Sequence, residues 1–277
     1  MTSKSKSFQS LRSTQEQKLC TTSSSGLPKW RQSPIDISRV AVWNKKFPPL
    51  LLTNYWSNIG TAILANTGKT VNIELANRRL PIMRGGPLKD DEYQFMNVQF
   101  RWGPSNCRGA EHSIDNIWRY LSRYSMEAQV MHWNTRYGSI DKCYDKSDGI
   151  SILSYLMQVV GCPGIPDNPM LALITHKLPE IKRTQSTINI TPDCLRWMMY
   201  ACTCPGYYTY TGSLTFPPYN ECVTWIIVPD AIKISSNQIE AFRSLYNHKW
   251  EHIARNYRSQ HLLHGRRIFF ATNDAVV

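Results

Sequence analysis

The sequence contains no apolar run long enough to cross a membrane as a helix. The longest such stretch, from Ile150 to Gly161, is interrupted by polar residues and falls well short of the about 20 apolar residues that a spanning helix needs. Cysteine is sparse, with 8 in 277 residues, which excludes a disulfide scaffold. There is no pair of Cys-x-x-Cys motifs, although Cys194, Cys202 and Cys204 lie close together. A metal site built from these three remains an alternative to reduced, partly buried thiols.

Acidic residues are also few. The chain has 20 Asp and Glu against 32 Lys and Arg, a net charge of +12. Such a balance favours acidic partners and says nothing about the fold. Apolar residues make up 42% of the chain, which excludes a disordered chain or a coiled coil and predicts a soluble globular protein with a sizeable core.

The N-terminal residues 1–26 hold eight Ser, four Thr and three Gln without a continuous apolar segment, so no secretory signal peptide is expected. A Ser-rich start with Lys4, Lys6 and Arg12 leaves a mitochondrial transit peptide as an alternative. We expect a flexible tail over residues 1–26, one domain over residues 27–277, and a cytoplasmic protein.

Beyond the tail, short runs of β-forming residues are separated by Pro, Gly and Asn, which is the pattern of a large mixed or antiparallel sheet. The expected strands are Thr61–Leu64, Thr70–Leu75, Met96–Trp102, Glu127–Trp133, Leu171–Ile174, Tyr207–Thr211 and Val223–Val228. The expected helices are Ser113–Ser125, Ser151–Val160 and Ser236–Tyr246, the last with a capping signal at Ser235/Ser236.

Two of these strands carry unexpected polar residues. Alternation along Met96–Trp102 places Gln99 and Arg101 on one face, about 6–7 Å apart, and Val98, Phe100 and Trp102 on the other. A buried amide or guanidinium must be paired. These side chains therefore line an internal pocket, unless the polar faces are simply solvated.

Six motifs, in this order, resemble α-class carbonic anhydrases over about Gln32 to Phe270. They are Gln32-Ser-Pro-Ile-Asp, Gly109-Ala-Glu-His-Ser-Ile-Asp, Met131-His-Trp-Asn, Gly212-Ser-Leu-Thr-Phe-Pro-Pro, Glu221-Cys-Val-Thr-Trp and Asn256-Tyr-Arg. The resemblance implies a mixed α+β, β-dominated fold, a single domain around a large twisted, mostly antiparallel sheet with short surface helices.

The family's chemistry needs a zinc ion on three neutral imidazoles, with a bound water whose pKa is lowered to about 7. By resemblance, the three ligand positions are Gln99, Arg101 and Gln129. An amide is a poor zinc donor, and a guanidinium stays charged and repels a dication. We expect no zinc, no other cofactor and no enzyme activity.

Other positions of the implied pocket are mixed. Lys69 stands at the proton-shuttle position, and Phe216 replaces a threonine near the substrate. Residues matching the family's orienting groups are kept, and we expect Arg101 to pair with Glu111, directly or through Thr215. The implied vestigial pocket comprises Lys69, Glu111, Glu127, Met131, Thr215, Phe216 and Asn256.

The resemblance also bears on the compartment. Secreted members carry a disulfide from a Cys shortly before Gln-Ser-Pro to a Cys directly after Pro-Pro. Here the first stretch is Leu27-Pro-Lys-Trp-Arg and the second position is Tyr219, so neither Cys is present. Glu221-Cys222 resembles the cytosolic members.

These features predict a catalytically silent carbonic anhydrase-related protein that acts as a protein-interaction or structural module. One alternative is a small-molecule or anion binder that uses the vestigial pocket. Another is a weak metal-independent hydrolase that uses Glu111 or Thr215.

The partner is expected to be a protein with an acidic surface, such as a receptor, a filament or a larger assembly. Nucleic acid is not expected, and contact with a membrane surface without spanning it is a further alternative. The segment Asn247–Arg267 matches the family's C-terminal region in part, which favours a packed role, but it is rich in cations and aromatics. Its candidate partner-binding residues are Lys249, Trp250, Arg255, Arg266 and Arg267.

Overall fold

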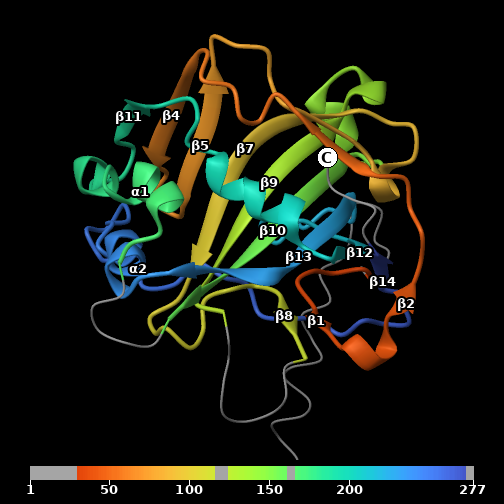
Figure 1. Cartoon of the computed structure of the whole chain (residues 1–277). Coiled ribbons are helices and arrows are strands. Elements are labelled where there is room, and N and C mark those ends of the chain that lie inside the picture. The colour runs from red at the N-terminus through yellow and green to blue at the C-terminus, as the bar shows by residue number, and fades with distance from the viewer. Residues whose placement is uncertain (1–29, 116–123, 161–165, 273–277) are drawn as a thin grey trace, which may run out of the picture.

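A computed structural model describes residues 30–115, 124–160 and 166–272 (Figure 1). Twelve strands form one large sheet with the order β11-β4-β5-β7-β9-β10-β13-β12-β14-β2, and β6 joins β3 to β7. The strands are β2 Trp43–Asn44, β3 Leu50–Thr53, β4 Thr61–Asn66, β5 Val71–Ala76, β6 Ile82–Gly85, β7 Tyr93–Trp102, β9 Met126–Asn134, β10 Ile150–Val159, β11 Thr187–Ile190, β12 Gly206–Gly212, β13 Val223–Ile234 and β14 Phe269–Thr272. A separate parallel pair joins β1, Asp36–Ile37, to β8, Ser113–Ile114.

Most neighbouring strands of the large sheet are antiparallel. The exceptions are β10 with β13 and β14 with β2, which are parallel. The strands twist across the molecule and the helices lie at its surface, as Figure 1 shows. The predicted fold class is therefore confirmed, and six of the seven expected strands lie in this sheet.

The two α-helices are α1, Pro169–Thr175, and α2, Ser236–Arg243. Short 3-10 helices cover Arg39–Ala41, Gly86–Leu88, Thr135–Tyr137, Ile140–Cys143, Leu178–Ile181 and Arg196–Thr203. The predicted capping signal is confirmed, because Ser235 and Gln238 form a reciprocal capping box at the start of α2. None of the helices in the described ranges is long and apolar enough to span a membrane.

Three predictions of secondary structure were wrong. Ser151–Val160 was predicted as a helix and forms most of β10, while Leu171–Ile174 was predicted as a strand and lies in α1. The helix predicted over Ser113–Ser125 begins instead with the two residues of β8. Residues 116–123 and the predicted tail, residues 1–26, lie outside the described residues.

Two apolar clusters account for most of the core. The larger one includes Val98, Phe100 and Trp102 from β7, together with Ala128 and Val130 from β9. Because successive side chains of a strand point to opposite faces, Gln99, Arg101 and Gln129 are directed away from this cluster. The sheet thus presents three polar side chains on the face opposite its larger core.

Candidate functional site

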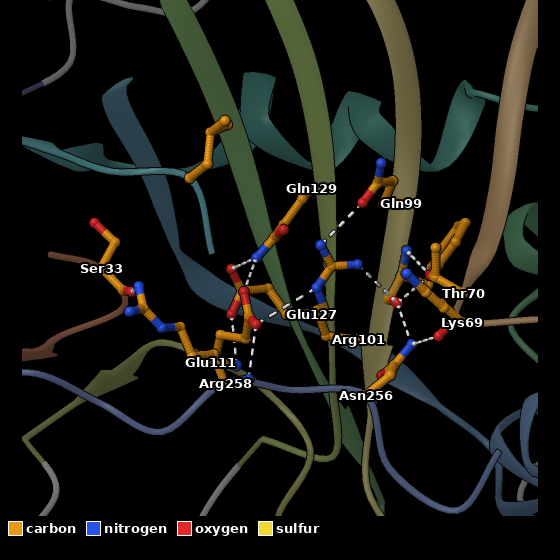
Figure 2. A network of polar contacts seen from close by, with 12 residues as sticks. Ser33, Lys69, Thr70, Gln99, Arg101, Glu111, Glu127, Gln129, Asn256 and Arg258 are labelled. Atoms are coloured by element: carbon orange, nitrogen blue, oxygen red, sulfur yellow. Dashed lines mark hydrogen bonds and ion pairs between the residues drawn. The ribbon is translucent and has the colours of Figure 1, made fainter. Parts of the chain in front are cut away.

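Strands β7 and β9 place the three implied ligand positions next to one another. In their antiparallel register, Gln99 is opposite Gln129 and Arg101 is opposite Glu127. Gln129 and Arg101 are 1% and 4% exposed, so both are buried. Figure 2 shows Arg101 between Gln99 on one side and Glu111 on the other. The structure therefore brings together the residues that the sequence singled out.

The Arg101 guanidinium is held by two side chains. Its Nη2 donates to Gln99 Oε1 at 2.9 Å, and its Nε lies 3.5 Å from Glu111 Oε1. The predicted ion pair is confirmed and is direct. Thr215 does not bridge it, since the Thr215 hydroxyl has no hydrogen-bond partner in the described part of the chain.

Glu111 is also engaged by its other neighbours. Its Oε2 accepts from Gln129 Nε2 at 2.6 Å, and its Oε1 accepts from the backbone N–H of Arg258 at 2.9 Å. Both oxygens therefore have donors. The other amide atom of Gln129, Oε1, is buried and has no partner among the described residues.

Glu127 lies at the centre of a second group of donors. It accepts from the backbone N–H groups of Glu111 and His112, each at 2.8 Å, and from Ser154 Oγ, also at 2.8 Å. His112 Nδ1 lies 2.9 Å from the carboxylate, and Gln129 Nε2 donates at 3.0 Å. Burial alone would raise the pKa of the Glu127 carboxyl, but the charge and hydrogen bonds of His112, with the Gln129 amide, outweigh it and lower that pKa.

A cavity of about 830 Å³ opens above this network. Six of the implied positions line it: Lys69, Gln99, Arg101, Thr215, Phe216 and Asn256. No Asp or Glu is among the described residues of its lining. The cavity is thus bordered by cations and neutral polar groups.

Other implied pocket residues have different places. Met131 is buried in the second apolar cluster, and Glu111 and Glu127 lie outside the cavity lining. Asn256 lines the cavity but acts as a clamp: its Nδ2 donates to the carbonyls of Lys69 and Phe100, and its Oδ1 accepts from the Trp102 N–H. It thereby ties its own segment to the end of β7 and to the loop before β5.

Among the lining residues that the sequence analysis missed are two asparagines. Asn72 and Asn97 line the cavity, and each has a buried amide oxygen without a partner in the described ranges. Asn97 lies two residues before Gln99 on β7, so alternation could have found it. Asn72 pairs with Gln99 across β5 and β7, a register that the sequence alone does not give.

The five candidate partner-binding residues do not form one patch. Arg255 lines the central cavity, and Trp250 is 65% exposed with the Arg183 guanidinium 5.5 Å from its ring centre. Lys249 is exposed beside Trp250. Arg266 is half-buried and donates to backbone carbonyls, and the Arg267 guanidinium lies 4.8 Å from the ring centre of Trp43.

Within the described residues, no group of three or more His, Cys, Asp or Glu side chains is placed to hold a metal ion. The conventional ligand types of a zinc site are therefore not gathered anywhere in those ranges. The alternative metal site at Cys194, Cys202 and Cys204 is likewise not formed by those of its side chains that the structure describes.

The fold and the buried polar network define a β-dominated domain with a polar cavity beside two central strands. The chain belongs to the eukaryotic-type carbonic anhydrase family, whose model matches residues 16–272. It is 34% identical to carbonic anhydrase 6 of Bos taurus over 248 residues, 85% of this chain and 71% of that protein. It is 31% identical to carbonic anhydrase 1 of Oryctolagus cuniculus over 219 residues, 78% of this chain and 86% of that protein.

Proposed function

We propose that this family member holds no catalytic zinc, does not hydrate CO2, and acts by binding a protein with an acidic surface. The observation that carries the proposal is the buried ion pair between Arg101 and Glu111. By resemblance, Arg101 stands where the family has a zinc-ligand imidazole.

The chemistry of the donor set supports the absence of zinc. A guanidinium is positively charged at any accessible pH and has no lone pair for a metal. Gln99 Oε1 already accepts from Arg101, and Gln129 Nε2 donates to Glu111 and Glu127. The residues present therefore do not fit a zinc ion.

An interaction role is supported by charge and by exposed aromatic side chains. The net charge is +12, and Trp43 and Trp250 are 55% and 65% exposed. Each has a guanidinium near its ring face, Arg267 and Arg183 respectively. Tryptophan and arginine are among the residues enriched at protein interfaces.

A second candidate function is the binding of a small anion in the central cavity. It is favoured by Lys69, Arg101 and Arg255 in a lining without a described carboxylate, and by the unpartnered hydroxyl of Thr215. Hydrolysis has less support, because that hydroxyl has no base hydrogen-bonded to it in the described ranges.

We place the protein in a reducing compartment, the cytoplasm. Cys107, Cys143, Cys194 and Cys222 form no disulfide among the described residues. Burial raises the pKa of the Cys194 and Cys222 thiols to about 12, which suits inert structural thiols.

The decisive test measures zinc and CO2 hydration on the same preparation. The wild-type chain, expressed with added zinc, is expected to hold far less than one zinc per chain by plasma mass spectrometry. Stopped-flow CO2 hydration should match the uncatalysed rate. One zinc per chain together with catalysed hydration would overturn the proposal.

The matched comparison is the triple substitution Gln99→His, Arg101→His and Gln129→His. It restores three neutral imidazoles, so we expect it to bind zinc in the same measurement. A melting curve with and without zinc shows that the variant is folded and that the metal is bound to the native state.

A further inference from the structure

A second cavity, of about 430 Å³, lies away from the central site and is bordered by β12, β14 and the segment directly after β2. It is lined by positively charged, apolar and neutral polar residues that come from distant parts of the sequence. The cations are Arg31, Lys45, Lys89, Arg266 and Arg267, and Asp148 is the carboxylate among the described lining residues.

Some of these charges are already engaged. Arg31 forms a 3.4 Å ion pair with Glu221, and Arg266 donates to the carbonyls of Gln32 and Leu263. Asp148 accepts a hydrogen bond from the Tyr137 hydroxyl at 2.6 Å. By contrast, Lys45, Lys89 and Arg267 have no carboxylate within ion-pair distance among the residues that the structure describes. Three cations thus remain for a ligand.

Aromatic rings hold two of these cations in place. Lys45 Nζ lies 4.8 Å from the ring centre of Phe47 and 5.2 Å from that of Phe269, while the Arg267 guanidinium lies 4.8 Å from that of Trp43. A ring face attracts a cation without neutralising its charge. The two groups are therefore positioned in advance, with N–H donors left for an anion.

The open edge of the sheet is part of the same surface. The order of the large sheet ends at β2. The backbone N–H group of Trp43 donates to the carbonyl of Ile268, directly before β14, and that of Lys45 donates to the carbonyl of Phe270 in β14. Alternation directs the N–H of Asn44 away from the sheet, where an extended segment could add to the edge.

We propose that this edge is a docking surface for an extended acidic segment of a partner protein. An apolar side chain of the segment enters the cavity beside Phe47, Leu88 and Phe269, and its carboxylates contact Lys45, Lys89 and Arg267. The inference deepens the proposed interaction role and rests on it. The exposed Trp43 with its stacked arginine favours a protein segment over a free small anion, because that pair offers contact area beyond the cavity.

The test uses the whole chain and a fluorescein-labelled decapeptide of alternating glutamate and leucine, followed by fluorescence anisotropy. The double variant K45E/R267E reverses the charges at the edge. The matched control K69E/R255E makes the same change of net charge at the central cavity. The variant K45Q/R267Q removes the two charges without reversing them. Melting curves for all variants show whether each one is folded.

We expect K45E/R267E to lower the affinity for the peptide by at least about tenfold. K45Q/R267Q should lower the affinity less, and K69E/R255E should leave it nearly unchanged. The same peptide with glutamine for glutamate should bind much more weakly. Equal loss in both double variants would overturn the edge as the docking surface while leaving an acidic partner in place. Equal binding of the glutamine peptide would overturn the acidic segment itself.

Benzoate tests whether the same site binds a small anion instead. If benzoate binds as tightly as the peptide and depends equally on Lys45 and Arg267, the site takes small anions and the protein-segment proposal fails. The zinc and CO2 measurements are independent of these variants, so failure here is distinguishable from failure of the proposed absence of catalysis.

Discussion

At the scale of single residues, the buried network around Arg101 explains how charged side chains at the centre of the sheet find partners. The sequence identified Gln99, Arg101 and Gln129 through resemblance, and it predicted Glu111 as the partner of Arg101. It could not give the direct geometry, or the clamp made by Asn256, because both depend on backbone segments that approach from elsewhere in the chain. Residue identity fixed the chemistry available, and tertiary structure fixed which atoms meet.

Replacing Arg101 with methionine should lower the free energy of unfolding by about 3 kcal/mol, because Glu111 then remains buried without its ion pair. Urea denaturation measures the change. R101M combined with E111Q should recover at least half of it. Arg196→Met removes an exposed pair with Asp193 and should cost less than about 1 kcal/mol. Wild-type stability in R101M would contradict a structural role for the pair.

His132 should make the protein acid-sensitive. Its ring is fully buried, with Nε2 2.5 Å from the Tyr55 hydroxyl, and burial lowers its pKa from 6.5 to about 3. The unfolded chain therefore binds a proton that the folded chain excludes, so stability falls as the pH drops from about 6.5 toward 3. Between pH 7 and pH 5, the wild type should lose about 2 kcal/mol more than H132Q.

Urea titrations at a series of pH values test this, with His176→Gln as the control at an exposed histidine. The control should keep the wild-type pH dependence. If H132Q loses stability with acid as steeply as the wild type, His132 is not the group responsible.

At the scale of elements, the errors and successes of the sequence analysis have physical reasons. Residues of β10 are buried on both faces along most of the strand, so apolar alternation is absent. Ser151 and Ser154, three residues apart, imitate a helical period, yet both side chains are hydrogen-bonded within the sheet. In α1, the signal that was overlooked is Asn168 before Pro169, an N-cap followed by proline at the first turn.

The capping box of α2 also links the two helices. Gln238 Nε2 donates to the carbonyl of Asn168, the residue that caps α1. Ser235→Ala should lower the free energy of unfolding by about 1 kcal/mol, because the Gln238 N–H loses its acceptor. Asn237→Ala, at an exposed position of the same helix, should change it by less than about 0.5 kcal/mol. Chemical denaturation compares the two variants.

At the scale of the molecule, the sequence predicted the fold class through six dispersed motifs, and the structure agrees. It predicted neither the cavity beside β2 nor the separation of the C-terminal cations into different places. Those features arise where residues more than 220 positions apart come into contact, as Trp43 and Phe269 do. Local sequence patterns do not reveal such contacts.

Removal of metal ions should not change the stability of the domain. If the polar network replaces a metal centre, dialysis against EDTA leaves the melting temperature unchanged, because no ligand that stabilises the native state is removed. Differential scanning calorimetry before and after dialysis measures this. The zinc-loaded triple histidine variant is the comparison and should melt at a lower temperature after EDTA. A fall of several degrees in the wild type would show that a bound metal contributes to its stability.

The parallel pairing of β2 with β14 has a consequence for biosynthesis. Trp43 and Lys45 emerge from the ribosome early, but their backbone partners Ile268 and Phe270 emerge more than 200 residues later. Contacts so distant along the chain form late and slowly. The cationic edge is therefore among the last surfaces to be assembled, and a partner that recognises it selects finished molecules over nascent ones.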